Sequence, residues 1–302
     1  MLPIKLKIPD KFFNEEVRCG YNISRQMKEI WAVELDLLDQ FIKVCEEYKL
    51  KYFVMGGTLL GTIRHKGFIP WDDDIDVIMP RNDYNKLLQI GPKVFQHPYF
   101  FSTPETEHKF WRSHIQIRNS ETTGSIQSDE SRNNNKGIFI DVFVLDDVPD
   151  DPVKRDIHRK KLSKIYRWVS IDMDLEYRKK NLKCIKYIIL KIITKLFVNA
   201  ESYSKTFRKF NKLCALYSDS ETHTVAHTAL SYREAVVWEK NDFLNSQNMP
   251  FEMLNVTVPA GYKSVLTKHY GENFMEIPKE YPKTAHGEVF FDVNKPFTFY
   301  YK

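Results

Sequence analysis

Apolar residues recur at helical spacing near the start of the chain. In residues 30–50, IWAVELDLLDQFIKVCEEYKL, they occupy positions 30, 33, 37, 41, 45 and 48, which predicts a helix with one buried face. A short β-prone stretch at residues 52–55 then ends at a pair of glycines, after which TLLGTIR predicts a short helix. Residues 74–80, DIDVIMP, predict a strand closed by Pro80.

Further helices and strands follow along the chain. A helix capped by Asn82 is expected over residues 82–90, and another that ends at Gly271 is expected over residues 260–271. Four more stretches have the pattern of strands: residues 99–102, 111–117, 137–145 and 254–258. No internal repeat is visible, and 302 residues with 42% hydrophobic side chains are enough to bury one sizeable core.

Composition narrows the class of protein. The four cysteines lie far apart, without a CxxC pair or a Cys/His cluster, so we expect free thiols rather than a zinc site. The first residues, MLPIKLKIPDKFF, lack the apolar core of a signal peptide, and no uncharged apolar run approaches 18 residues. These features predict a cytoplasmic protein.

Positive charge is concentrated in one region. Residues 154–213 hold 18 Lys and Arg against 5 Asp and Glu, beside a body that is net acidic. Within this region, CIKYIILKIITKLFV at residues 184–198 could form an amphipathic helix on an anionic membrane face, near a lipid-linked acceptor. The alternative is a helical lobe with a solvated lysine face. No nucleic-acid-binding module is visible, so no nucleic-acid partner is expected.

The acidic stretch at residues 70–80, PWDDDIDVIMP, carries the first candidate chemistry. On a strand, Asp74 and Asp76 point to one face and Asp72 is in phase with them, whereas Asp73 is out of phase and solvated. Neighbouring carboxylates raise each other's pKa, and a divalent cation removes that repulsion. Mg²⁺ prefers carboxylate oxygens and shares its other positions with phosphate and water, so Mg²⁺ or Mn²⁺ is the expected cofactor.

A further carboxylate, Asp141, interrupts the apolar run GIFIDVFVL at residues 137–145. A lone buried aspartate is costly unless it is paired or binds a metal. If its strand neighbours that of Asp74 and Asp76, the three carboxylates form one site for one or two Mg²⁺ ions.

A pair of glycines, Gly56 and Gly57, stands upstream at the start of a helix with Thr58. Backbone N–H groups can approach an anion closely there, and the helix dipole favours negative charge. Three further residues lie between the glycines and the aspartates and could contact a phosphate: Arg64, His65 and Lys66.

Each of these residues also has a structural interpretation. The acidic stretch could be a turn or a weak Ca²⁺ loop, although it lacks EF-hand spacing. Asp141 could cap backbone amides, Arg64 could form a surface ion pair, and His65 could serve packing.

Residues 56–84, GGTLLGTIRHKGFIPWDDDIDVIMPRNDY, closely resemble the signature of the LicD family, and residues 137–146, GIFIDVFVLD, resemble its later acidic strand. The order of FE at 251–252, VPAGYKSVLTKHYGENFMEIP and His286 is also similar. That family includes bacterial phosphocholine transferases and is related to fukutin and fukutin-related protein. The resemblance implies an α+β, nucleotidyltransferase-like fold with a mixed β-sheet flanked by helices. Residues 154–213 have no counterpart in this pattern and predict an additional basic helical lobe.

The resemblance also implies a chemistry. A CDP-linked donor, typically CDP-choline, gives its phosphoalcohol group to a sugar hydroxyl of a cell-surface glycan, and CMP leaves. The implied metal ligands are Asp72, Asp74, Asp76 and Asp141. As a mechanistic hypothesis we expect four catalytic residues: Asp74, Asp76, Asp141 and Arg64. In this hypothesis Asp141 completes the metal site and accepts the proton of the attacking hydroxyl, and Arg64 neutralises developing charge. The residues expected to bind the nucleotide or substrate are Gly56, Gly57, Thr58, Arg64, His65, Lys66 and His286.

Alternatives to this function stay open at the level of sequence. The donor could carry another alcohol, such as ribitol, or the chain could be a nucleotidyltransferase that moves NMP onto its acceptor. A non-enzymatic module that binds Ca²⁺ is the remaining possibility. The expected layout is an N-terminal arm (1–29), a catalytic core (30–150), a basic helical insert (151–220) and a C-terminal part (221–302) that completes the catalytic domain.

Overall fold

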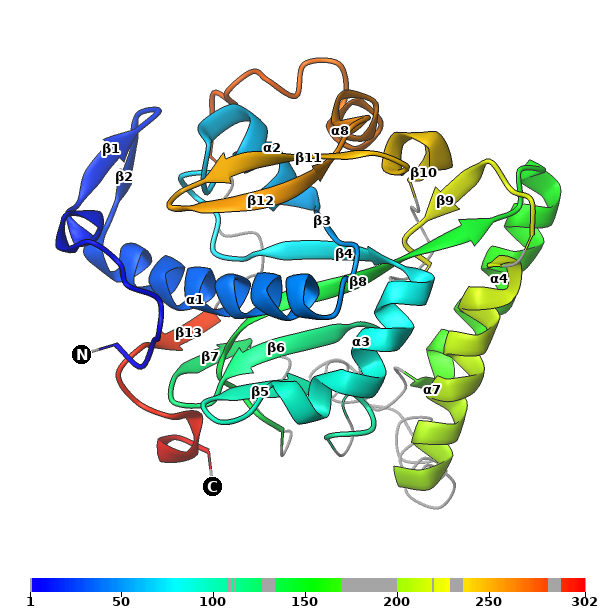
Figure 1. The fold of residues 1–302 in the computed structure, drawn as a ribbon, viewed down its shortest axis with the longest axis horizontal. Coiled ribbons are helices and arrows are strands. Elements are labelled where there is room, and N and C mark those ends of the chain that lie inside the picture. Colours follow the sequence, from blue (N-terminus) through cyan, green and yellow to red (C-terminus); the bar gives the residue numbers. More distant parts are fainter. Residues whose placement is uncertain are drawn as a thin grey trace, which may run out of the picture.

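The chain folds around a mixed β-sheet (Figure 1). The structure is a computed structural model that describes residues 2–107, 110, 112–126, 134–169, 200–218, 220–228, 236–281 and 289–301. Within these residues the sheet has seven strands: β3 (Phe53–Val54), β4 (Asp76–Pro80), β5 (Tyr99–Ser102), β6 (Ile115–Asn119), β8 (Ile138–Val148), β9 (Thr224–Ala226) and β10 (Val237–Glu239). Their order is β10-β9-β8-β4-β3, with β6 pairing both β8 and β5. β4 and β8 run parallel, and the other neighbours are antiparallel.

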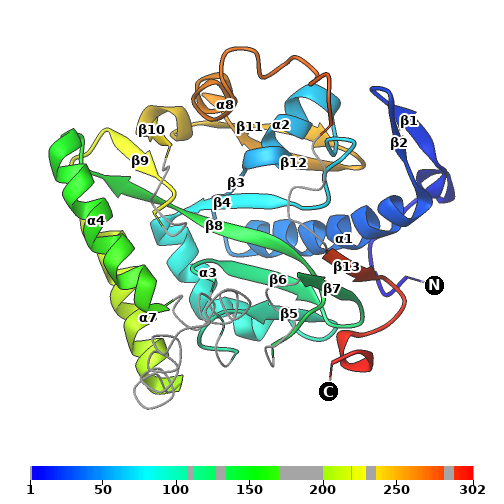
Figure 2. The same cartoon turned by 180° about the vertical axis from the view of Figure 1, so that it is seen from behind.

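Helices and smaller strand pairs surround this sheet. The described α-helices are α1 (Arg25–Glu47), α2 (Gly56–His65), α3 (Arg81–Val94), α4 (Pro152–Val169), α7 (Ala200–Cys214) and α8 (Tyr262–Tyr270). The paired strands outside the sheet are β1 (Glu16–Arg18) with β2 (Tyr21–Ile23), β7 (Thr123–Ile126) with β13 (Val289–Asp292), and β11 (Ser246–Phe251) with β12 (Leu254–Pro259). Short 3-10 helices are η1 (Asp10–Phe13), η3 (Ala215–Tyr217), η4 (Lys240–Phe243) and η5 (Phe297–Phe299). Figure 2 shows the β1–β2 hairpin standing away from the sheet at the start of α1, on the side where both termini lie.

The predicted helix at residues 30–50 is confirmed, but it is buried on more than one face. α1 starts at Arg25, where the Ser24 hydroxyl accepts the N–H of Met27 at 3.2 Å as an N-cap. Every residue from 30 to 38 is buried. α1 packs against β6, β8 and β12, and the N-terminal arm covers it from outside through Asp36, which accepts the N–H groups of Lys5 and Leu6. The helix therefore has no solvent-facing side over residues 30–38.

Several predicted element ends differ from the structure. α3 begins at Arg81 after Pro80, so Asn82 is not its cap, because Pro80 already fixes the extended conformation that precedes the helix. β6 begins at Ile115 rather than at residue 111. The helix that ends at Gly271 is confirmed, with Gly271 at φ +88°.

The basic region is helical where the structure describes it. α4 and α7 lie side by side at one end of the molecule (Figure 1). The side chains of Leu162, Phe210 and Cys214 are buried. The stretch 184–198, for which an amphipathic helix was predicted, lies outside the described residues. Among the residues that are described, no helix has both the length and the apolar content needed to cross a membrane.

Candidate active site

Two parallel strands bring two of the predicted carboxylates together. β4 and β8 pair in a register that places Asp76 opposite Asp141, and the N–H of Asp141 donates to the carbonyl oxygen of Ile75 at 2.9 Å. Residues that face each other in this way project to the same side of the sheet. The arrangement that the sequence prediction required for a shared site is therefore present.

The loop before β4 adds more carboxylates. Carboxylate oxygens of Asp72, Asp73 and Asp74 all lie within 4.8 Å of one another. The sequence had predicted that Asp74 lies on the strand and on the same face as Asp76. In the structure β4 begins at Asp76, so Asp74 precedes the strand. Asp73 is buried at 9% exposure, and the prediction that it is solvated was wrong. The reason is the same for both: residues 72–75 are not in a strand, so the period of two does not apply to them.

The glycine pair leaves room for these carboxylates. Gly56 is the first residue of α2 and has φ +56°, which favours glycine. A Cβ on Gly56 would lie 2.9 Å from Oδ2 of Asp76, and one on Gly57 would overlap Oδ2 of Asp72. The hydroxyl of Thr58 accepts the N–H of Asp76 at 2.8 Å. The start of α2 is thus in contact with the acidic residues, and the positive end of its dipole faces them.

Asp141 is held by two polar neighbours on β6 and just before it. The side-chain amide of Gln116 donates to Oδ1 of Asp141 at 2.7 Å, and Nε2 of His114 lies 3.1 Å from the same oxygen. Burial alone would raise the pKa of Asp141, but the interactions with His114, Arg112 and Gln116 outweigh burial and lower it. By contrast, burial and the charges of Asp74 and Asp141 raise the pKa of Asp76 well above its ordinary value.

Sequence reasoning missed His114 and Gln116, although a signal for them existed. Both are polar residues two apart in the predicted strand 111–117, so the strand period places them on one face.

Arg64, His65 and Lys66 lie at the other end of α2. A helix rises 1.5 Å per residue, so Arg64 stands roughly 12 Å along the axis from Gly56. Its Nη1 donates to the carbonyl oxygens of Phe274 and Glu276, both at 3.0 Å. Burial, with the nearby charge of Arg64, lowers the pKa of His65 to about 4, so His65 is neutral near pH 7. Lys66 is the C-cap of α2.

The roles predicted for these three residues stay predictions. His286, the other residue predicted to bind substrate, lies outside the described residues.

A buried glutamate also belongs to the surroundings of the acidic loop. Glu34 on α1 is 1% exposed, and its Oε2 has no hydrogen-bond partner among the described residues. Burial raises the pKa of Glu34 well above its ordinary value, and the charges of Asp74, Asp73 and Asp72 raise it further. The sequence contained one indication of Glu34: a charged residue directly follows position 33, which the apolar pattern had placed on the buried face of the helix.

Three aromatic side chains gather beside the acidic loop. The ring of Trp71, the residue before Asp72, lies 4.7 Å from the ring of Tyr281 and 6.0 Å from that of Tyr21, between centroids. All three rings are partly exposed. The guanidinium of Arg64 lies 6.0 Å from the ring centroid of Trp71, so the Trp71 ring makes a cation–π contact with a side chain of the protein.

A divalent cation fits the residues of this site. They offer closely spaced carboxylate oxygens, the ligands that Mg²⁺ and Mn²⁺ take. Oε2 of Glu34 is buried without a hydrogen-bond partner in the described part of the chain, and the two glycines leave free the space beside Asp76 and Asp72 that a Cβ would fill.

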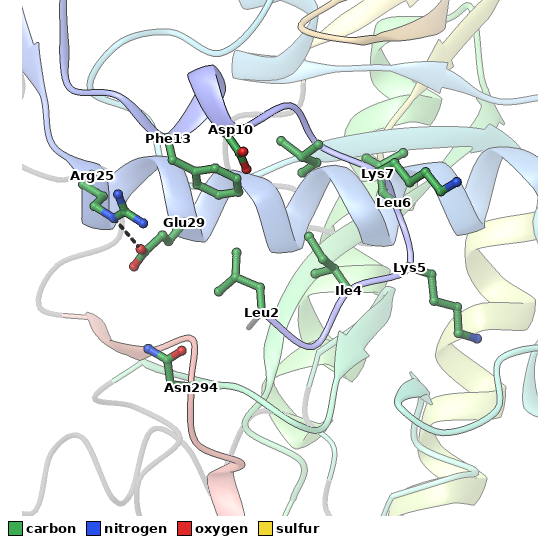
Figure 3. A pocket seen from close by; sticks show the side chains of 11 residues that line it. Leu2, Ile4, Lys5, Leu6, Lys7, Asp10, Phe13, Arg25, Glu29 and Asn294 are labelled. Carbon is green, nitrogen blue, oxygen red and sulfur yellow. Dashed lines mark hydrogen bonds and ion pairs between the residues drawn. The ribbon is translucent and has the colours of Figure 1, made fainter.

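A separate cavity of about 570 Å³ lies between the N-terminal residues and α1 (Figure 3). Leu2, Phe13 and the ion pair of Arg25 with Glu29, at 3.0 Å, are among the groups that line it. Of the predicted site residues that the structure describes, none lines this cavity.

The fold and the site thus define a mixed β-sheet protein with a cluster of closely spaced carboxylates beside a glycine pair. A family model described as "LicD/FKTN/FKRP, nucleotidyltransferase domain" matches residues 49–183. The chain is 28% identical over 266 residues to the lipopolysaccharide cholinephosphotransferase LicD of Haemophilus influenzae, covering 86% of this chain and 95% of that protein. An uncharacterised protein of Rickettsia prowazekii is 45% identical over 53 residues, which are 18% of this chain and 20% of that protein. The resemblance to the LicD family is confirmed, through the domain at residues 49–183 that the family model matches.

Proposed function

We propose that this protein transfers a phosphoalcohol, phosphocholine above all, from a CDP-linked donor to a sugar hydroxyl of a cell-surface glycan. The observation that carries this proposal is the pairing of Asp76 with Asp141 in parallel strands, beside Gly56 at the start of α2. The Haemophilus relative is named as a lipopolysaccharide cholinephosphotransferase, which supports phosphocholine and a glycan as donor group and acceptor. The proposed fold is that of nucleotidyltransferases, in agreement with the matched domain.

In the proposed reaction, the sugar hydroxyl oxygen forms a bond to the phosphorus that carries the alcohol. The bond from that phosphorus to the oxygen of CMP breaks, CMP leaves with the electron pair, and the hydroxyl proton passes to a carboxylate. A divalent cation held by Asp72, Asp74, Asp76 and Asp141 would neutralise the charge of the donor's diphosphate. No covalent intermediate on the protein is required, because positioning and electrostatic stabilisation carry most of phosphoryl transfer.

The side chains around the site would divide the work. Asp141 has a lowered pKa and two hydrogen-bonding neighbours on one oxygen, which makes it a weaker base and favours its role as a cation ligand. The N–H groups at the start of α2 would face the donor phosphates. Arg64 lies at the opposite end of α2 from the glycine pair, where its guanidinium donates to the carbonyl oxygens of residues 274 and 276. It would therefore act on a part of the donor that lies away from the phosphates at Gly56.

The aromatic group of Tyr21, Trp71 and Tyr281 supports choline as the alcohol. A quaternary ammonium has no hydrogen-bond donor and is bound by aromatic faces. Trp71 directly precedes Asp72, so a choline placed on its ring would be close to the acidic loop that would hold the cation for the donor's diphosphate. Ribitol, a neutral polyol, would draw no benefit from such a surface.

Calorimetric titration of the purified protein with CDP-choline, CDP-ribitol and CDP, each with and without Mg²⁺, tests the proposal. We expect Mg²⁺-dependent binding that favours CDP-choline over CDP, and release of CMP when an acceptor glycan is added. Asp76→Asn should abolish both, because it removes a charge that binds the cation. Asp156→Asn is the matched control, since Asp156 pairs with Arg159 and Lys160 on the surface of α4.

The products separate this function from its nearest rival. A nucleotidyltransferase would release pyrophosphate from a nucleoside triphosphate. Pyrophosphate release, or equal and Mg²⁺-independent binding of the three CDP compounds, would contradict the proposal.

A further inference from the structure

Buried polar side chains on β6 lead toward Asp141. Gln116 and Arg118 are two residues apart on this strand, so their side chains project to the same face of the sheet. Gln116 is 0% exposed and Arg118 is 1% exposed. Buried polar groups are hydrogen-bonded in folded proteins, so the partners of these two residues show what they hold in place.

The contacts of Arg118 fix the direction of the Gln116 amide. Nη2 of Arg118 donates to Oε1 of Gln116, and Nη1 donates to the carbonyl oxygen of Gly137 at 2.9 Å. The guanidinium also lies over the ring of Phe139, 4.6 Å from its centroid. A guanidinium has no acceptor, so the amide oxygen of Gln116 faces Arg118 and the amide NH₂ group faces the other way. That NH₂ group donates to Oδ1 of Asp141 at 2.7 Å.

The sheet places Asp141 between Gln116 and Asp76. Gln116 lies opposite Asp141 in the antiparallel pair of β6 with β8, and Asp76 lies opposite the same residue in the parallel pair of β4 with β8 (Figure 2). Nε2 of His114 lies 3.1 Å from Oδ1 of Asp141, the same oxygen that Gln116 binds. Both of these neighbours come from the β6 side, so Oδ1 is turned away from Asp76.

We propose that Arg118 and Gln116 are positioning residues for Asp141. Arg118 fixes the amide of Gln116, and this amide holds Oδ1 of Asp141 toward β6. Oδ2 is thereby kept for a cation shared with Asp76 on β4. Residues that orient a metal ligand in this way commonly decide the affinity of the site for its metal. The inference rests on the metal centre of the proposed function, but it does not depend on the identity of the donor or acceptor.

Titration of the full chain with Mn²⁺, followed by electron paramagnetic resonance in the absence of nucleotide, tests this inference. Gln116→Met nearly keeps the volume of the side chain but removes its donor. We expect it to raise the Kd of Mn²⁺ by about 10- to 100-fold, the usual loss when such a partner of a metal ligand is removed. In turnover, it should raise the Mg²⁺ concentration for half-maximal rate more than it lowers kcat at saturating Mg²⁺, because excess cation restores occupancy.

Further variants separate positioning from stability. Asn119→Leu is the matched control, because it removes another buried amide of β6, one that donates to the carbonyl oxygen of Pro3 at 2.7 Å. It should lower the Tm, as Gln116→Met does, and leave the Kd of Mn²⁺ unchanged. Arg118→Met should raise the Kd in the wild-type chain but not in the Gln116→Met chain, because Arg118 acts through Gln116.

A milder variant serves if Gln116→Met does not fold. Arg118→Lys keeps the positive charge but lacks the planar fork that donates to two oxygens at once. It should therefore also raise the Kd of Mn²⁺, while Asn119→Leu again leaves it unchanged.

The inference is overturned if the wild-type chain binds no Mn²⁺, or if Gln116→Met binds it as tightly as the wild type does. It is also overturned if the effects of Arg118→Met and Gln116→Met add, or if Asn119→Leu raises the Kd equally. Its failure is distinct from failure of the proposed function. A chain that transfers phosphocholine while its Mn²⁺ affinity ignores Gln116 keeps the function and loses the inference. A chain whose Kd rises as expected but which transfers no phosphoalcohol keeps the inference and loses the function.

Discussion

At the scale of single residues, the site depends on glycines, which have no side chain, as much as on the charged residues. Gly56 combines a positive φ of +56° with a carboxylate 2.9 Å from where its Cβ would be. Alanine at this position would be strained and would also displace Asp76. A left-handed conformation costs an L-residue roughly 1–2 kcal/mol. We expect Gly56→Ala to lower the free energy of unfolding by about this amount and to abolish Mg²⁺-dependent binding of CDP-choline.

Gly271 offers the matched control for this prediction. Its φ is +88°, but among the described residues no atom beyond its two chain neighbours lies within 4 Å of where its Cβ would be. Gly271→Ala should therefore show the loss of stability in urea unfolding without the loss of binding. Equal effects of the two substitutions on binding would show that the contact of Gly56 with Asp76 has no role.

The aromatic group allows a second prediction at this scale. Trp71→Leu should weaken the binding of CDP-choline more than that of CDP, because only the first carries a cation for the ring. A cation–π contact is worth about 0.5–2 kcal/mol, which is roughly a 2- to 30-fold change in Kd. The ratio of the two Kd values, measured by calorimetry, is the readout, since a general loss of structure would change both. An unchanged ratio would place the choline elsewhere.

At the scale of elements, the sequence predicted the local structure well and its surroundings poorly. The strand at 99–102 and the helix that ends at Gly271 follow from local patterns, and both are confirmed. The pairing of β7 with β13 joins residues more than 160 positions apart, and no local pattern indicates it. The burial of Glu34 likewise depends on what α1 packs against, which the period of a helix does not reveal.

The candidate site shows the same division. The sequence identified Asp76 and Asp141 and the condition under which they would meet, and the parallel pairing of their strands fulfils it. It did not identify His114, because the neighbour of a strand in a sheet is decided by the whole topology. It misplaced Asp73, because the strand that it extended back to residue 74 starts two residues later.

A buried ion pair joins several elements and leads to a prediction about stability. Arg81 at the start of α3 makes two hydrogen bonds to Asp146 of β8, at 2.6 and 2.8 Å, and a third to Asn211 of α7 at 2.6 Å. Thr228 also donates to Asp146. Arg81 and Asp146 are 5% and 0% exposed. Arg81→Met leaves the Asp146 carboxylate buried without its cationic partner and should lower the free energy of unfolding by about 3–5 kcal/mol in urea.

The double substitution Arg81→Met with Asp146→Leu tests the reason for this loss. Two apolar groups in place of a buried pair are close to neutral in many proteins, so most of the stability should return. If the double variant is as unstable as Arg81→Met, the loss comes from packing of the Arg81 side chain rather than from an unpaired carboxylate.

At the scale of the whole molecule, the basic region stands apart from the acidic centre. Its described part has an inner and an outer face. Tyr166 of α4 packs against Phe210 of α7 with ring centroids 5.6 Å apart, and Leu162 and Cys214 are buried. Lysines on α4 are exposed at positions 154, 160, 161 and 164. This arrangement supports the interpretation of residues 152–169 and 200–214 as a helical lobe with a solvated lysine face.

Flotation with vesicles decides whether that charge reaches a membrane. A lysine near an anionic surface contributes about 1 kcal/mol, and salt screens this attraction within a Debye length of about 8 Å at physiological ionic strength. We expect the full chain to bind vesicles that contain anionic lipid at low salt, to detach at high salt, and to ignore zwitterionic vesicles. Changing Lys154, Lys161 and Lys164 to Gln should remove about 3 kcal/mol of this attraction and leave the binding of CDP-choline unchanged. Binding that persists at high salt or on zwitterionic vesicles would mean instead that apolar side chains insert into the lipid, as the amphipathic interpretation of residues 184–198 predicts.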